Sequence, residues 1–135
     1  MIEWSARFSV SDNSIDTQHQ QLFSIMNEII DGMKSGKCDD RNFIAAILNK
    51  LLEYTQYHFR EEEIRFNATP YPLKAEHVRA HKDFTKLVAE KIANKDKGIP
   101  CLNATEIANI AYNWLCQHIL KFDKTYIEYI NGTKK

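Results

Sequence analysis

The chain has 135 residues, and its 18 Lys and Arg balance 18 Asp and Glu, so the formal net charge is zero. This length fits a single domain over residues 1–135 with one core, and the neutral balance argues against nucleic acid or an anionic membrane as a partner. Only four Gly and three Pro occur, which favours an all-α fold over a turn-rich β domain.

Targeting features and cysteine usage point to the cytoplasm. The opening MIEWSARFSV lacks the apolar run of a signal peptide, and no stretch approaches the roughly 20 apolar residues that span a bilayer. The three cysteines, Cys38, Cys101 and Cys116, are widely spaced, so reduced thiols are expected rather than a disulfide framework. We therefore expect a soluble cytoplasmic protein, with a monomer as the default.

Residues 1–15 predict an ordered arm laid over a core, because apolar side chains recur among polar neighbours at Trp4, Phe8, Val10 and Ile15. The first helix is expected to begin at a capping Asp16 and to end at Gly36. Its apolar stripe has the 3.6-residue period of a helix and includes His19.

A second helix is expected to begin after Asp39 and Asp40 and to stop near Asn67. Two polar residues on its inner face, His58 and Glu62, are four positions apart and are therefore neighbours on the helix surface. The adjacent Glu61 and Glu63 point elsewhere and are interpreted as a solvated run of charge.

A Pro-x-Pro break around Tyr71 separates this helix from a third, whose inner side carries His77 and His81 and which Lys97, Gly98 and Pro100 close. A fourth helix is expected to begin at Asn103 as the cap, to carry His118 inward, and to end at Asn131 and Gly132. Four amphipathic helices with short connections predict an up-down-up-down bundle over residues 16–132.

All five histidines fall on inward stripes, and each predicted helix carries at least one. A single inward histidine is more often a hydrogen-bonded core residue, but five such residues would require five separate buried hydrogen-bonding arrangements. The pattern therefore favours a metal centre. Glu62 joins it, because an unpaired buried carboxylate is costly and a metal ion is its natural partner.

Asp123 is less clear from spacing. It follows His118 by five residues, and an ideal α-helix has then turned about 140° past the starting position. A π-bulge or a tilted approach would bring both residues to one site, and such bulges are frequent at functional sites. The alternative is that Asp123 is a surface charge on the fourth helix.

Four segments, IDTQHQQLF, HFREEE, HVRAH and HILKFD, resemble the hemerythrin family in its single-domain bacterial form. The resemblance covers nearly the whole chain and implies a non-haem di-iron centre that binds dioxygen reversibly, for oxygen storage, transport or delivery. The resemblance further implies that one iron is bound by His77, His81 and His118. The other iron is then bound by His19 and His58, and Glu62 and Asp123 bridge the two irons.

The implied ligand count leaves one open coordination position, on the iron with two histidines, where dioxygen is expected. Keeping the bound gas from protons and reductants requires a dry apolar pocket. The resemblance places five residues there, namely Leu22, Phe59, Trp114, Leu115 and Ile119. Tyr71 and Tyr126 are candidates to orient the ligands from outside, and Phe66 stands where many relatives have Met.

Three alternatives to oxygen binding are consistent with a metal centre of this kind. A di-iron oxidase, peroxide reductase or nitric oxide reductase is disfavoured, because ferritin-like enzymes use Glu-x-x-His pairs that these metal positions lack. An oxygen-sensing module would need a separate output partner. A zinc hydrolase is weaker still, because Val78 stands where the His-Glu-x-x-His signature requires its glutamate. We therefore expect a binding protein and not an enzyme, with an unidentified recipient protein.

Overall fold

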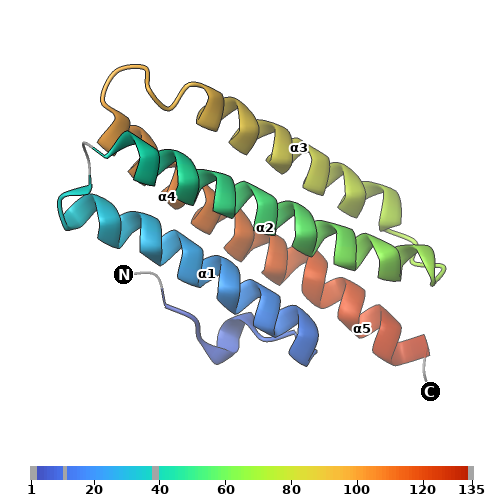
Figure 1. Ribbon diagram of the computed structural model, residues 1–135. Helices are drawn as coiled ribbons and strands as arrows, with labels where there is room; N and C mark the ends of the chain where they lie inside the picture. The colour runs from blue at the N-terminus through green and yellow to red at the C-terminus, as the bar shows by residue number, and fades with distance from the viewer. Residues whose placement is uncertain (1–2, 11, 38–39, 134–135) are drawn as a thin grey trace.

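The computed structural model describes residues 3–10, 12–37 and 40–133. Four long helices run up-down-up-down (Figure 1). The fourth, α4, continues through a π-helical segment, η3, into a last helix, α5. Their bounds are α1 Asn13–Lys34, α2 Arg41–Asn67, α3 Lys74–Ala93, α4 Pro100–His118, η3 Ile119–Asp123 and α5 Lys124–Thr133. The all-α bundle expected from the sequence is confirmed.

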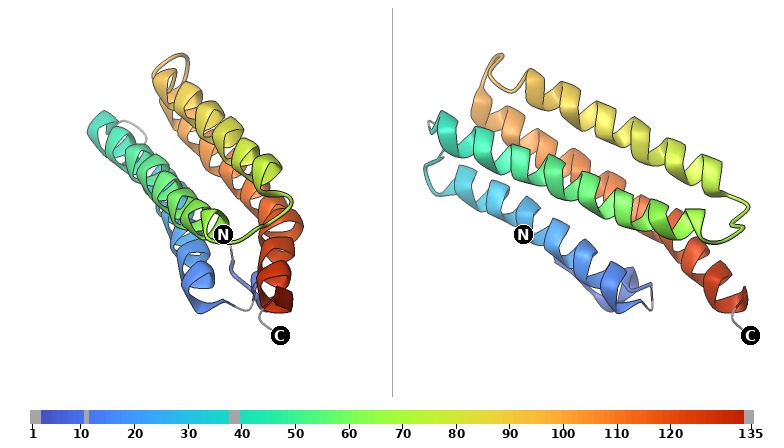
Figure 2. Two further views of the ribbon diagram at one scale, coloured as in Figure 1. Left: turned by 90° about the vertical axis from the view of Figure 1, so that its right-hand side faces the viewer. Right: turned by 45° about the vertical axis from the view of Figure 1, so that its right-hand side comes forward.

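Each long helix packs against two neighbours, so the four lie at the corners of a square. Contacts join α1 to α2 and to α4, and α3 to the same two helices. Figure 2 shows α1 and α2 on one side of the bundle and α3 with α4 on the other. This arrangement leaves one shared interior into which every helix presents a face.

The first helix begins earlier than its sequence suggests. Asp12, and not Asp16, is the N-cap of α1, since its side chain accepts a hydrogen bond from the Ile15 amide at 3.0 Å. Asp16 lies in the first turn and accepts from Ser9 Oγ at 2.7 Å and from the Val10 amide at 2.9 Å. The predicted cap therefore ties the arm to α1.

The other helix ends follow local chemistry. Asp40 caps α2 by accepting from the Phe43 amide at 2.9 Å, as expected, whereas Asp39 lies outside the described residues. Gly36 follows α1 with a positive φ of 94°, a conformation that glycine adopts without strain.

Asn103 does not cap α4, because the helix already begins at Pro100, where proline needs no amide hydrogen. The Asn103 side-chain amide instead donates to the carbonyls of Lys95 at 2.8 Å and Lys97 at 2.6 Å, and so closes the α3–α4 connection.

The arm is packed on the bundle. A short 3-10 turn, η1, spans Ala6–Phe8, and the side chains of Phe8 and Val10 are buried. The Trp4 ring is partly buried and lies edge-on to Phe23, with ring centroids 5.4 Å apart. This part of the arm covers α1, as its apolar residues indicated, whereas Ile15 belongs to the helix itself.

The cysteines depart from expectation. Cys116 is a free thiol, Cys101 is disulfide-bonded, and Cys38 lies outside the described residues. The prediction of reduced thiols is therefore wrong for Cys101. This residue lies in the first turn of α4, at the same end of the bundle as the C-terminus of α1 (Figure 1). Spacing along a chain does not show which distant segments a bundle brings to one end.

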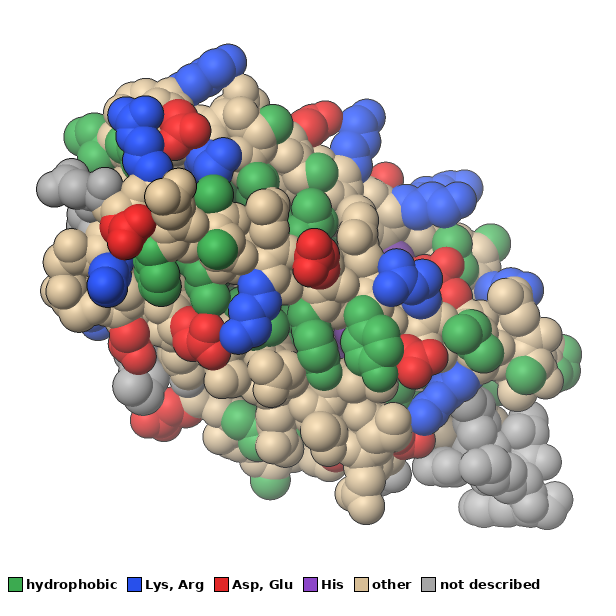
Figure 3. Space-filling view, viewed as in Figure 1, with side chains coloured by type: hydrophobic (Ala, Val, Ile, Leu, Met, Phe, Trp, Pro, Cys, Tyr) green, Lys and Arg blue, Asp and Glu red, His purple; other side chains and the backbone are tan. Residues whose placement is uncertain are grey.

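The outer surface is mixed in charge. On the face viewed in Figure 3, Lys and Arg side chains alternate with Asp and Glu, and hardly any histidine surface is visible. Among the residues that the structure describes, no helix is long and apolar enough to cross a membrane.

Candidate metal centre

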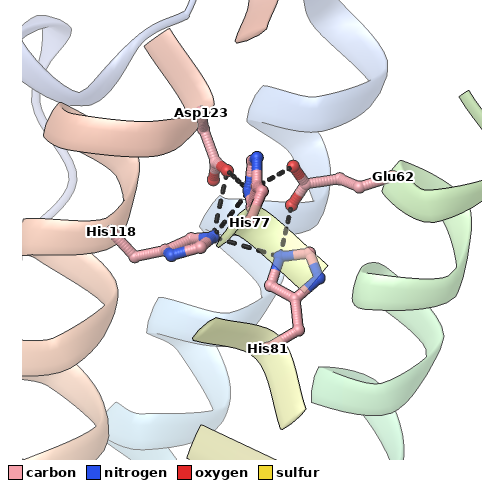
Figure 4. A group of neighbouring side chains, drawn as sticks. All are labelled: Glu62, His77, His81, His118 and Asp123. Carbon is pink, nitrogen blue, oxygen red and sulfur yellow. Dashed lines mark hydrogen bonds and ion pairs between the residues drawn. The ribbon is translucent and has the colours of Figure 1, made fainter. Parts of the chain in front are cut away.

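Seven polar side chains meet in the interior, and each is at most 3% exposed. They come from α1, α2, α3, α4 and η3, and they are the seven residues that the sequence singled out, namely His19, His58, Glu62, His77, His81, His118 and Asp123. Figure 4 shows five of them pointing at a common centre from three sides. The structure thus brings every sequence-predicted metal residue into one cluster.

The cluster divides into two overlapping groups, in each of which one atom per residue lies within 4.8 Å of all the others. One group contains three histidines and the other two, and both share Glu62 and Asp123. Glu62 Oε1 lies 2.7 Å from His58 Nε2, while its Oε2 lies 3.5 Å from His77 Nε2. Each group therefore meets the same carboxylate, as a bridge between two ions requires.

Asp123 is shared in the same way. Its Oδ2 lies 2.9 Å from His19 Nε2, and its Oδ1 lies 3.0 Å from His77 Nε2 and 3.1 Å from His118 Nε2. One oxygen thus faces the two-histidine group, and the other faces the three-histidine group.

The π-helical segment explains how Asp123 reaches the cluster. A π-turn has more residues than an α-turn, so five positions bring the chain back to nearly the same face. The segment spans Ile119–Asp123 and begins directly after His118. The π-bulge considered for this pair is therefore present, and the surface-charge alternative is wrong because Asp123 is fully buried.

Histidine nitrogens that face one another indicate that cations belong here. The Nε2 atoms of His77 and His118 are 3.0 Å apart, those of His81 and His118 are 3.1 Å apart, and those of His19 and His58 are also 3.1 Å apart. A neutral imidazole carries one hydrogen and one lone pair, so converging ring nitrogens place several lone pairs together. Positive ions between them would turn that repulsion into coordination.

The buried carboxylates fit the same conclusion. Among residues 3–10, 12–37 and 40–133, neither oxygen of Glu62, nor Oδ2 of Asp123, has a hydrogen-bond partner of good geometry, despite the short distances to histidine nitrogens. Buried polar atoms are nearly always satisfied, and an ionised carboxylate without compensation costs several kcal/mol. The donor set of imidazole and carboxylate suits iron, which accepts both ligand types.

Burial shapes the proton affinity of both carboxylates. It raises the pKa of Glu62 well above its usual value, and the negative charge of Asp123 adds to this effect. Burial also acts to raise the pKa of Asp123, but the close approach of His118, and then of His19 and His77, holds that pKa well below its usual value. The histidines thus stabilise the anionic form of Asp123. The anionic form of Glu62 needs a nearby cation to offset the cost of its burial.

Three of the histidines are held in the form that binds metal. Burial is the largest cause of a lowered pKa at His58, His77 and His81, and neighbouring histidines lower it further. A neutral imidazole has a free lone pair, whereas a protonated one has none. These rings are therefore ready for coordination at neutral pH.

Two ring nitrogens on the far side from the centre bind partners that sequence reasoning missed. His58 Nδ1 donates to Gln18 Oε1 at 2.6 Å, and His81 Nδ1 donates to Glu63 Oε2 at 3.1 Å. Interpreting Glu63 as a solvated charge was therefore wrong, because it reaches across from α2 to α3. Helical spacing reveals neighbours on one helix, while both of these bonds join two helices.

The two tyrosines suggested as orienting residues make no such bond. The hydroxyls of Tyr71 and Tyr126 are buried, and no described residue forms a hydrogen bond with either. Burial is the largest cause that raises the pKa of each to about 12, so both remain neutral. With Phe66, whose ring centroid lies 4.4 Å from that of His77, they form an aromatic wall beside the cluster.

The five expected pocket residues differ in burial and in their contacts with the cluster. Leu22, Phe59, Leu115 and Ile119 are buried, and Trp114 is half-buried. Phe59 stacks on His81 with centroids 3.8 Å apart and planes 5° apart, and Trp114 stacks on His118 at 4.3 Å and 14°. The two aromatic rings therefore cover the three-histidine group.

The chain is similar to known proteins along nearly its whole length. Residues 10–130 match the family model described as the hemerythrin HHE cation binding domain. A bacteriohemerythrin of Clostridium acetobutylicum is 30% identical over 134 residues, covering 95% of this chain and 100% of that protein. Myohemerythrin-1 of Phascolopsis gouldii is 29% identical and covers 91% of this chain and 89% of its own length.

A solved structure gives the same result. The crystal structure of a wild-type hemerythrin superposes with a TM-score of 0.80 at 25% identity, covering 93% of this chain and 95% of that one.

Proposed function

This chain belongs to the hemerythrin family, and from that premise we propose that it binds dioxygen reversibly at a di-iron centre. The observation that carries the proposal is the pair of buried carboxylates shared by a three-histidine and a two-histidine group. This asymmetric donor set holds two ions and gives one of them fewer protein ligands than the other.

We assign the ligands by these groups. One iron would be held by His77, His81 and His118, and the other by His19 and His58, with Glu62 and Asp123 bridging both. The two-histidine side has the lower number of protein ligands, and we assign dioxygen to that side. When bound, the iron pair supplies the electrons that dioxygen binding requires and recovers them on release.

The protein's own contribution is to hold charge and exclude water. Neutral histidines add no positive charge, so the two carboxylates are the main protein charges opposing the ions. The side chains of Leu22, Phe59, Leu115 and Ile119 are at most 3% exposed and supply no exchangeable proton. Such a dry surrounding is what reversible binding needs, because water and protons promote irreversible oxidation.

Binding rather than catalysis fits the donors. Carboxylate-rich bundles use Glu-x-x-His pairs, whereas this cluster has five histidines and two carboxylates. We infer a single-domain oxygen-binding protein of the cytoplasm, acting as a monomer in oxygen storage, transport or delivery to a recipient protein. Names of relatives, bacteriohemerythrin and myohemerythrin, support the binding role.

The test is an oxygenation spectrum with metal analysis. Protein reduced without oxygen should contain two irons per chain, gain a visible absorption band in air, and lose the band when oxygen is removed. Prompt irreversible bleaching with release of hydrogen peroxide would instead support an oxidase, and absence of iron would refute the assignment altogether.

A further inference from the structure

The outer nitrogens of the five histidines are not treated alike. The Nδ1 atoms of His19, His77 and His118 are buried and have no hydrogen-bond partner among the residues that the structure describes. His58 Nδ1 meets the neutral amide oxygen of Gln18, and His81 Nδ1 meets the carboxylate of Glu63. Within the part of the chain that the structure describes, His81 is thus the one cluster histidine whose outer nitrogen donates to a carboxylate.

The Glu63–His81 pair also has a distinctive position. The His81 side chain is 2% exposed, but that of Glu63 is 32% exposed. Both residues line a surface cavity of about 440 Å³ between α2 and α3, beside Phe59 and Lys82. The stacked Phe59 ring fixes the plane of the His81 imidazole, and the Glu63 bond fixes its rotation within that plane. The pair links an inner ligand to the solvent-facing wall of this cavity.

We propose that Glu63 is a positioning residue for the iron held by His77, His81 and His118, and that its charge lowers the reduction potential of that iron. The proposal rests on the di-iron function proposed above. A carboxylate that accepts from the outer N–H of a metal-bound histidine fixes the tautomer and makes the inner nitrogen a stronger donor. Stronger donation and nearby negative charge both favour the ferric over the ferrous state.

The two metal positions are then distinguished by outer partners as well as by ligand number. Gln18 offers His58 a neutral oxygen at 2.6 Å, which fixes the ring without adding charge. Glu63 offers His81 a charged oxygen, and charge-assisted hydrogen bonds are roughly twice as strong as neutral ones. Exchanging these two chemistries should therefore move the potential in opposite directions.

The experiment compares Glu63→Gln with wild type by spectroelectrochemical titration of the iron-loaded protein. Glutamine keeps an acceptor for His81 Nδ1 and removes the charge, so iron content should stay at two per chain while the midpoint potential rises. Gln18→Glu should lower it. Glu61→Gln removes the same charge two residues away on α2, where the described part of the chain shows no hydrogen bond to a histidine, and should leave the potential unchanged. Equal shifts in the Glu61 and Glu63 variants, or none, would overturn the proposal.

A second measurement separates this inference from the oxygen-binding function. In zinc-loaded protein, which binds no dioxygen, the His81 ring N–H should give a slowly exchanging nitrogen-15 NMR signal that Glu63→Ala abolishes. If that signal is present and sensitive to Glu63 while the iron protein fails to oxygenate, the positioning role stands and the proposed function fails. A signal that Glu63→Ala leaves unchanged refutes the positioning role, whatever the oxygen spectrum shows.

Discussion

Asp123 Oδ2 lies 2.9 Å from His19 Nε2, although the two residues belong to η3 and α1, near opposite ends of the chain. His58, Glu62, His77 and His81 come from the two helices between them. The metal centre is therefore a crosslink of the entire bundle, and metal that binds only the folded chain adds its binding free energy to folding.

Loss of one ligand should show this directly. His118→Ala removes the third nitrogen of one iron, and the iron content should fall from two per chain to one or fewer, with loss of stable oxygen binding. Metal analysis after desalting measures the change. Gln117→Ala, at an exposed neighbouring position of α4, is the matched control and should keep both irons. Full iron content in His118→Ala would refute the ligand assignment.

Glu62→Gln should have opposite effects with and without metal. Burial raises the pKa of Glu62, so the ionised side chain destabilises the folded protein when no metal is bound. The uncharged amide of glutamine removes this destabilisation. We expect the metal-free variant to be more stable on the order of 1 kcal/mol, and to bind iron poorly. Thermal unfolding of metal-free protein and iron analysis measure the two effects. A lower Tm combined with two bound irons would contradict both.

The stability of the metal-free protein should fall on acidification. His58, His77 and His81 have lowered pKa values when folded, so below about pH 6.5 the unfolded chain binds more protons than the folded one. Each such histidine then lowers the free energy of unfolding by about 1.4 kcal/mol for each pH unit of acidification.

Glu62 acts with the opposite sign, because its raised pKa lets the folded chain keep a proton that the unfolded chain has lost above about pH 4.5. It offsets about one of the three histidines. Thermal unfolding at pH 7.5 and pH 5.5 should therefore show a lower Tm at the acidic value, and a Tm that rises on acidification would show that these histidines are not neutral in the fold.

The arm should depend on Asp16. Asp16→Ala removes the acceptor for Ser9 Oγ and the Val10 amide, which at about 1 kcal/mol per bond should lower the free energy of unfolding by about 2 kcal/mol. Faster proteolytic cleavage within residues 3–10 should accompany the loss. Asp31→Ala, an exposed carboxylate on the same helix, should change neither property. Unaltered proteolysis in Asp16→Ala would show that apolar packing alone holds the arm.

Much of this molecule follows from periodicity. The positions of His19, His58, His77, His81 and His118 on inward stripes predict both the bundle and the convergence of these residues. An apolar stripe can be read from the sequence of one helix alone. A polar side chain within such a stripe is costly to bury unless it binds a partner, so it indicates a site in the core. For these residues the pattern therefore carries three-dimensional information.

The sequence pattern does not predict contacts between residues on different helices. It also does not decide which of several nearby polar groups a side chain binds. The sequence pattern indicated Asp16 as the cap of α1, whereas the bond from the Ile15 amide makes Asp12 the cap and Asp16 binds Ser9 and Val10 of the arm instead. The bond of Glu63 to His81 depends on how α2 faces α3, which spacing within α2 does not determine. The disulfide at Cys101 likewise depends on how the helices are arranged.

The π-helical segment gives the centre an internal near-symmetry. On α2, His58 and Glu62 face the cluster with three residues between them, whereas His118, at the end of α4, and Asp123, at the end of η3, do so with four. The pair His118 and Asp123 thus has the arrangement of His58 and Glu62 with one residue added between its members. The wider π-helical turn accommodates this extra residue. The two carboxylates proposed to bridge the irons are therefore equivalent in role but not in register, and an alignment that permits no single-residue gap between these pairs would miss their correspondence.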